Sequence, residues 1–195
     1  KVERVLDRRA AAAADASGYP PLHAEDELLI KWRGLGYEGI TWETGRLLLS
    51  MAEAAGHVAD YEAWNDRARQ LDDSGRKTRP QGTDAPFEKY EAQPSFLGGP
   101  DSLPLHRYQH EGLNWLRSCW HRRLNVMLAD EMGLGKTVQT VALVAALHAE
   151  YTRGPFLVCV PLSTVPNWDR EFRRWAPQLN CVTYCGSKEG RQLCR

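Results

Sequence analysis

The sequence predicts two parts: a small, curled three-stranded sheet closed by a helix, and then an incomplete α/β domain built on a parallel sheet. Two observations predict this fold class. Within residues 1–71, three short strand-like runs precede one run with helical spacing. Within residues 104–195, apolar strand-like runs alternate with helix-like runs, and the first strand leads into a glycine-containing loop.

The first part contains four predicted elements. Val2–Leu6 alternates like a half-buried strand, Glu27–Trp32 is a second apolar strand, and Ile40–Glu43 is a short third strand after a glycine-rich turn. Apolar residues then recur at helical spacing over Ala54–Leu71. The alanine-rich stretch from Ala10 to Pro21, between the first two strands, is expected to be a loop.

Residues 72–103 carry an Asp-Asp-Ser-Gly run and several prolines, which is typical of a linker that has little to bury. The second part then begins with a helix predicted over His106–Arg122. A buried strand at Val126–Ala129, a loop at Asp130–Thr137 and a helix at Val138–Ala149 follow it. Two further strands, Phe156–Val160 and Cys181–Cys185, are predicted on either side of a helix over Asn167–Trp175.

The loop DEMGLGKT has the residues that bind the phosphates of a nucleotide. Gly133 and Gly135 allow a tight turn whose amides face an anion, and the helix start adds its positive dipole end. Lys136 is expected to neutralise the β and γ phosphates, and the Thr137 hydroxyl is placed to bind Mg²⁺ beside the nucleotide. Asp130 stands where the general phosphate-loop pattern has its first glycine.

Composition and charge exclude several other classes. With 195 residues and 43% hydrophobic content, the chain is expected to form one large or two small globular domains, without a membrane span or signal peptide. The five scattered cysteines indicate reduced thiols of cytosol or nucleus. Cys181 with Cys185, and His106 with His110, are each too few for a metal site, because no third ligand is near in sequence.

The net charge of zero hides an uneven distribution. Residues 1–103 carry 13 basic and 18 acidic side chains, a balance of −5, whereas residues 104–195 carry 12 and 7, a balance of +5. The basic second part is therefore the better candidate for contact with a polyanion, although its charge alone does not establish nucleic-acid binding.

DEMGLGKT resembles the nucleotide loop of Swi/Snf-type ATPases, and the upstream segment YQHEGLNWL resembles the same family's YQxEGLNWL motif. The resemblance implies that residues 104–195 start the first RecA-like lobe of a superfamily 2 helicase-like motor. It implies ATP and Mg²⁺ as ligands, with Gln109 reading the adenine edge. It also implies DNA contact by Ser163 and Thr164, whose segment PLST resembles the family's first DNA-contacting motif. Arg170, Arg173 and Arg174 on the next helix are either DNA contacts or a solvated face.

Residues 1–71 resemble a chromodomain, specifically the second one of chromodomain helicase DNA-binding (CHD) remodellers, through VERVL and LLIKWRGLGYEGITWE. Chromodomains that read methyl-lysine hold the cation among three aromatic rings. Here Trp32 matches one cage position, while Leu35 stands at a second, so a packing or docking role is favoured over methyl-lysine reading. Trp42 resembles the core tryptophan of the family.

Within the linker, FEKYEAQPSFLGG resembles the bridge that joins the second chromodomain of CHD proteins to the motor. Tyr90, Phe96 and Leu97 are then candidate anchors onto the motor surface. An ordinary flexible linker is the open alternative.

ATP hydrolysis also needs an acidic pair after another strand, and none of the acids after Thr137 follows a buried strand. We therefore expect a fragment of a nuclear, DNA- and nucleosome-binding remodeller that binds ATP without turning it over. The alternatives are a non-catalytic chromatin-docking module and an unrelated phosphate-loop kinase or transporter ATPase. The latter is disfavoured because those proteins have glycine at position 130.

Overall fold

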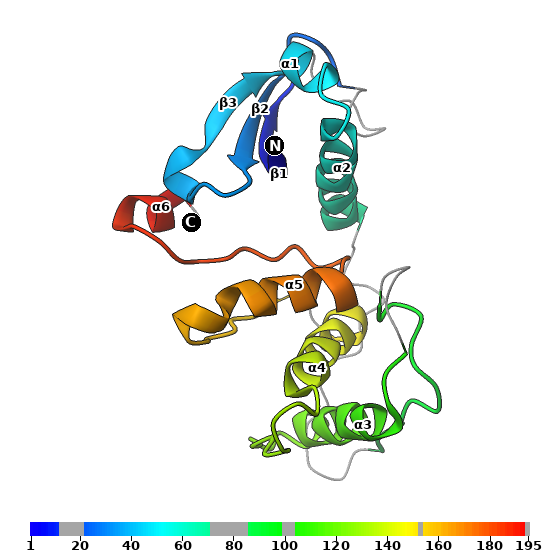
Figure 1. Ribbon diagram of the computed structural model, residues 1–195. Coiled ribbons are helices and arrows are strands. Elements are labelled where there is room, and N and C mark those ends of the chain that lie inside the picture. Colours follow the sequence, from blue (N-terminus) through cyan, green and yellow to red (C-terminus); the bar gives the residue numbers. More distant parts are fainter. Residues whose placement is uncertain (12–21, 71–85, 99–103, 152–153, 194–195) are drawn as a thin grey trace. The chain divides into compact units, whose positions relative to one another are not determined.

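The computed structural model describes residues 1–11, 22–70, 86–98, 104–151 and 154–193 (Figure 1). The chain divides into two compact units, which are described separately. The first unit is Lys1–Asp72 with Tyr184–Arg195, and the second is Asp73–Thr183.

The first unit contains an antiparallel sheet in the order β1–β2–β3. Strand β1 (Val2–Arg9) pairs with β2 (Glu27–Trp32), and β2 pairs with β3 (Thr41–Thr44). The other elements of this unit are helical: η1 (Tyr37–Gly39), α1 (Gly45–Leu49), α2 (Ala54–Gln70) and α6 (Lys188–Leu193). The three strands and the closing helix predicted from the sequence are confirmed. The loop predicted over Ala10–Pro21 lies mostly outside the described residues.

One face of this sheet forms the core of the first unit. Because side chains alternate along a strand, Leu28 and Ile30 point to the same face, and both are fully buried. They pack with Val5 from β1 and Val58 from α2. Trp32 continues the same alternation and packs against the edge of this core.

The expectation that Trp42 is a core residue is wrong. Trp42 pairs with Leu29 across the sheet, so its side chain lies on the face opposite Leu28 and Ile30. There the guanidinium carbon of Arg9 lies 3.8 Å from the centre of the Trp42 ring, a cation–π contact. Because of this strand register, Trp32 and not Trp42 packs against the core of the first unit.

A buried ion pair connects β1 to the turn before β2. Arg8 Nη2 donates to Asp26 Oδ2 at 2.7 Å, with both side chains at most 1% exposed, and Arg8 also pairs with Glu62 of α2. Burial opposes ionisation of Asp26, but amide donors from Ala11 and His23, together with Arg8, outweigh it and lower the pKa of Asp26. The pKa of Glu62 is raised, mainly by burial.

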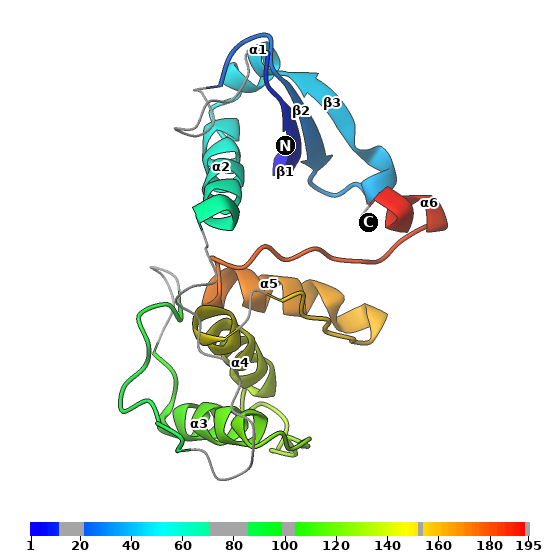
Figure 2. The ribbon, with the colours of Figure 1, turned by 180° about the vertical axis from the view of Figure 1, so that it is seen from behind.

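The second unit is built from helices α3 (Arg107–His121), α4 (Lys136–Glu150) and α5 (Val165–Trp175), with the short turn η3 (Leu162–Thr164) before α5. Helix α4 packs against both α3 and α5 (Figures 1 and 2). All three helices were predicted from the sequence. Leu113, Val141 and Ala145 form the fully buried centre of their interface.

The parallel sheet predicted for this unit is not present among the described residues. The segments 126–129, 156–160 and 181–185 are not strands there. A parallel strand keeps its geometry through hydrogen bonds to neighbours on both sides, and the described residues provide no such ladder. Met127 and Leu157 are accordingly 84% and 86% exposed, because no neighbouring strand or helix of the described residues covers these apolar side chains.

Residues 86–98 are anchored to the helices of the second unit. Leu97 is 3% exposed within its core, and Tyr90 and Phe96 pack against that core. The Gly98 amide donates to the Trp175 carbonyl at 2.7 Å, and Gln178 Nε2 donates to the Phe96 carbonyl at 3.0 Å. The anchoring expected for Tyr90, Phe96 and Leu97 is therefore observed within residues 86–98.

A polar cluster completes this anchor. Asn114 of α3 exchanges two hydrogen bonds with the backbone of Tyr90, at 2.8 and 3.0 Å. The Tyr90 hydroxyl donates to Glu150 of α4, which also pairs with Arg117 at 2.9 Å. Burial, followed by the hydrogen bond to Glu150, raises the pKa of Tyr90, so the phenol stays a proton donor.

Candidate nucleotide site

The loop before α4 is shaped by two glycines. Gly133 and Gly135 have φ angles of +90° and +76°, in the left-handed region that side chains disfavour. Gly135 is also the N-cap of α4, and a Cβ there would lie 2.3 Å from Gln109 Nε2. Both glycines are required by backbone shape, and the second also by close approach of α3.

Lys136 is the first residue of α4, and its side chain folds back over the loop. Its Nζ donates to the carbonyls of Asp130 at 2.7 Å and Glu131 at 2.8 Å. The ammonium therefore sits at the positive end of the α4 dipole, where an anion is favoured. Thr137 is the second residue of α4, so it too lies at the N-terminal end of this helix.

Gln109 connects α3 to this loop. It is 7% exposed, its Oε1 accepts from the His106 amide at 3.0 Å, and its Nε2 donates to the Leu134 carbonyl at 3.4 Å. The first contact caps α3, because it satisfies an amide that the helix leaves unpaired. The second fixes the distance between α3 and the loop. The adenine contact expected for Gln109 stays a prediction.

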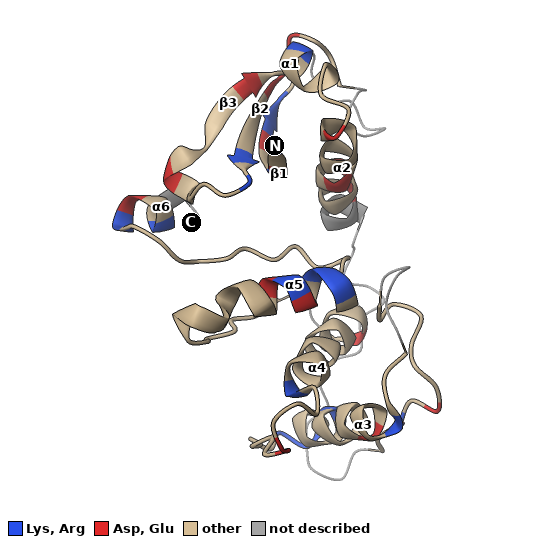
Figure 3. Cartoon of the chain, viewed as in Figure 1, with Lys and Arg blue, Asp and Glu red and all other residues tan. Residues whose placement is uncertain are grey.

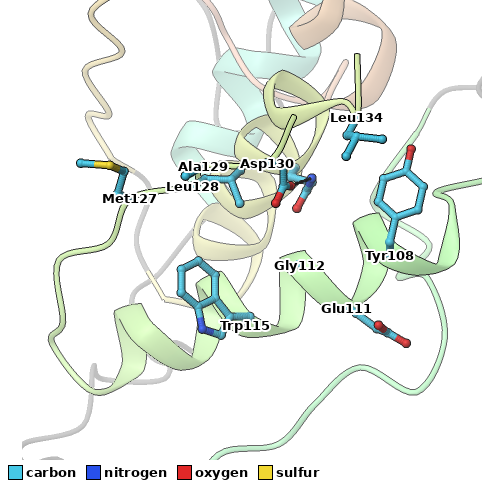
Figure 4. A pocket seen from close by; sticks show the side chains of 10 residues that line it. Tyr108, Glu111, Gly112, Trp115, Met127, Leu128, Ala129, Asp130 and Leu134 are labelled. Carbon is cyan, nitrogen blue, oxygen red and sulfur yellow. Dashed lines mark hydrogen bonds between the residues drawn. The ribbon is translucent and has the colours of Figure 1, made fainter. Parts of the chain in front are cut away.

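A cavity of about 490 Å³ opens beside the loop (Figure 4). Tyr108, Glu111 and Trp115 line it from α3, while Met127 and Leu134 line it from the loop side. Its volume lies in the range of small-molecule sites, and its walls are mainly apolar with a few polar groups.

Sequence reasoning missed a contact at the inner wall of this cavity. Gln139, on α4, is 1% exposed, and its Nε2 donates to Asp130 Oδ2 at 3.0 Å. Gly112 of α3 packs directly against the Gln139 amide oxygen. Gln139 follows Lys136 by three residues on α4, and this spacing alone did not indicate its contact with Asp130.

The PLST segment forms a turn that starts α5. Thr164 donates twice to the Pro161 carbonyl, from its amide at 2.9 Å and from its hydroxyl at 2.8 Å. Helix α5 begins at Val165, two residues before the predicted start, and Ser163 is exposed. Ser163 therefore offers its hydroxyl to solvent, whereas both Thr164 donors are used within the turn.

Basic and acidic residues alternate along the rest of α5 (Figure 3). Arg173 pairs with Asp169 at 2.9 Å, and Arg170 donates to Asn167. These contacts favour the solvated-face interpretation for the two arginines.

Two of the acids after Thr137 have structural partners in this unit. Glu150 binds Arg117 and Tyr90, and Asp169 binds Arg173. No group of three or more His, Cys, Asp or Glu side chains that could hold a metal occurs within the described ranges, and no helix there could span a membrane.

In the first unit, Trp32 is the predicted cage residue. Its indole Nε1 donates to Thr41 Oγ1 at 2.8 Å, while the ring packs against the core. Leu35, at the second cage position, is 53% exposed.

Comparison with known proteins identifies the family. Residues 108–195 match the SNF2-related domain. Over 197 residues, covering 100% of this chain and 11% of the relative, the sequence is 39% identical to Chromodomain-helicase-DNA-binding protein 1 of Gallus gallus. It is 42% identical over 171 residues to Protein CHROMATIN REMODELING 4 of Arabidopsis thaliana, covering 87% of this chain and 7% of that protein. The chain spans a small part of these relatives, and it belongs to the CHD type of SNF2-related proteins.

Proposed function

We propose that this chain contributes the nucleotide-binding loop and a chromodomain to an ATP-dependent chromatin remodeller that moves nucleosomes in the nucleus. The observation that carries the proposal is the loop itself. Lys136 and the start of α4 meet at a left-handed Gly135, an arrangement that gathers positive charge and amide donors at one point. The CHD and SNF2 relationships support the choice of ATP over other phosphorylated ligands.

In this proposal, each residue at the loop has a stated role. Lys136 exchanges its two carbonyl acceptors for the β and γ phosphates, and Gln109 reads the adenine edge from α3. Thr137 would hold Mg²⁺, which would supply positive charge beside the phosphates. Asp130, Gly133 and Gly135 shape the loop.

We assign residues 1–71 to the chromodomain, 72–103 to the bridge and 104–195 to the first lobe of the motor. DNA contact is proposed through the exposed Ser163 hydroxyl, which suits a phosphate oxygen. Because Thr164 uses its donors within the turn, its contribution is to hold that turn in shape.

A second candidate is a non-catalytic chromatin-docking module. It is favoured by one observation: Glu150 and Asp169 are engaged in structural pairs, so the described part of the second unit offers neither as a catalytic carboxylate. Binding and hydrolysis of ATP are therefore expected to be separable properties.

Phosphate release, measured with and without DNA, tests the proposal. A longer parent protein containing this chain should show DNA-stimulated release and lose it on Lys136→Ala. Lys89→Ala is a matched control, because it removes a positive charge from an exposed position in the same unit. The 195-residue chain should show no DNA-stimulated release. Hydrolysis by the chain alone, or a parent without activity, would contradict the proposed division of roles.

A further inference from the structure

Gln139 is a buried amide with one strong partner. Its Nε2 donates to Asp130 Oδ2 at 3.0 Å, and its side chain is 1% exposed. The ionised carboxylate of Asp130 can only accept hydrogen bonds, so the orientation of the amide is fixed, with Nε2 toward Asp130 and Oε1 away from it. Among the described residues, Oε1 has no hydrogen-bond partner.

Gly112 explains where the amide oxygen goes. A Cβ built on Gly112 would lie 1.9 Å from Gln139 Oε1, a distance that no real contact allows. Glycine is disfavoured inside a helix, yet Gly112 lies in the middle of α3. Its lack of a side chain makes room for Gln139 between α3 and the loop.

The arrangement has a cost that packing alone does not explain. A buried polar atom without a partner is unfavourable, and leucine would fill a similar volume without an unpaired oxygen. We therefore attribute the presence of glutamine at position 139 to its hydrogen bond with Asp130, the first residue of the phosphate loop.

We propose that Gln139 is a positioning residue for the phosphate loop. It holds the Asp130 carboxylate against α4, so that this negative charge stays out of the space for the phosphates and the loop keeps the shape in which Lys136 reaches its carbonyls. This inference rests on the proposed nucleotide function. A released carboxylate would repel the phosphates of the ligand.

The test uses the 195-residue chain and four variants: Gln139→Leu, Gln139→Glu, Asp130→Asn, and Gln139→Glu combined with Asp130→Asn. Gln139→Leu keeps the packing and removes the hydrogen bond. Gln139→Glu places two carboxylates in contact. The double variant restores the bond with donor and acceptor exchanged, and Asp130→Asn alone keeps an acceptor for Gln139.

Two readouts separate this inference from the proposed function. Without nucleotide, hydrogen exchange of the peptide covering residues 130–138 reports the order of the loop. It should be faster in Gln139→Leu and Gln139→Glu, and close to wild type in Asp130→Asn and in the double variant. With Mg-ATP, the first two variants should bind roughly three- to tenfold more weakly, since a charge-assisted bond at a partly exposed site is lost.

The outcomes are distinct. If wild-type protein binds no Mg-ATP, the proposed function fails, while the exchange pattern still decides whether Gln139 orders the loop. If Gln139→Glu shows wild-type exchange, or if the double variant restores neither exchange nor binding, then Gln139 is a packing residue and the inference is overturned.

Discussion

Replacing Asp26 by Asn removes the central acceptor of the first unit without changing its shape. Asp26 Oδ2 accepts from Arg8 at 2.7 Å and from the His23 amide at 2.8 Å, while Oδ1 accepts from the Ala11 amide at 2.8 Å. Asparagine keeps one of the two acceptor oxygens. Its NH₂ group replaces the other and faces a hydrogen-bond donor that has lost its acceptor. Arg8, whose side chain is 0% exposed, is left with Glu62 as its carboxylate partner.

The expected loss follows from this burial. Removing one partner of a buried ion pair costs about 3–5 kcal/mol, because the remaining charge stays in the interior. Glu62 still compensates part of the Arg8 charge, so we expect about 3 kcal/mol in the free energy of unfolding of the first unit. The matched control is Glu27→Gln. It breaks the neighbouring Arg9–Glu27 pair of 3.6 Å, whose side chains are 63% and 53% exposed, and should cost at most about 0.5 kcal/mol.

Hydrogen exchange of the β1 and β2 amides measures these two losses within the unit where they arise, whatever the stability of the second unit. Asp26→Asn should increase exchange through global opening by roughly a hundredfold, which is about 3 kcal/mol, and Glu27→Gln by less than threefold. Equal effects of the two variants would refute the argument, because they would show that burial does not set the strength of this ion pair.

Four further predictions address the pH dependence, the anchor of Tyr90, histone-peptide binding and DNA binding. Folding lowers the pKa of Asp26 from 3.8, so the stabilisation by its carboxylate should be complete above pH 3.8 and lost as the pH falls through the lower pKa of the folded state. Acid unfolding followed by circular dichroism should show this loss of stability in wild type, and a smaller loss in Asp26→Asn. Tyr90→Phe should destabilise the second unit by about 1–2 kcal/mol in urea unfolding, because Glu150 loses a buried donor, whereas the exposed Lys89→Ala should have no measurable effect. In peptide titrations the chain should not distinguish trimethylated from unmodified histone peptides, since Trp32 has no aromatic partner at position 35; a methylation-dependent micromolar affinity would contradict this. In DNA titrations, binding should be weak, independent of sequence and steeply reduced by salt. Tight DNA binding at several hundred millimolar salt would contradict this second expectation.

The sequence predicts helices α2, α3, α4 and α5 because their signals are local, whereas the short helices α1 and α6 were not predicted. The periodic apolar residues of α3 and α4, and the left-handed Gly135 that begins α4, are local properties that need no knowledge of neighbours. The strands of the first unit are likewise predicted, since their alternation matches a sheet with one buried face. The parallel sheet was wrongly expected within the described residues, because strand formation at 126–129 depends on partners that a local pattern cannot supply.

Within the candidate site, the glycines and Lys136 follow from the loop pattern alone. The roles of Gln139 and Gly112 do not, because they depend on the close approach of α3 to α4, a distance that spacing along one helix does not contain. Trp42 shows the same limit in the first unit. The face of the sheet on which Trp42 lies depends on its pairing with Leu29, and this pairing is known only from the strand register in the structure.

Titration of the 195-residue chain with Mg-ATP, followed by calorimetry, tests the central claim most directly. We expect weak but saturable binding at one site, lost in Lys136→Ala and unchanged in Lys89→Ala. Both variants remove one positive charge from the same unit, but only Lys136 lies at the loop. Equal affinity of wild type and Lys136→Ala, or no saturable binding by wild type, would contradict the assignment of this loop as the nucleotide site.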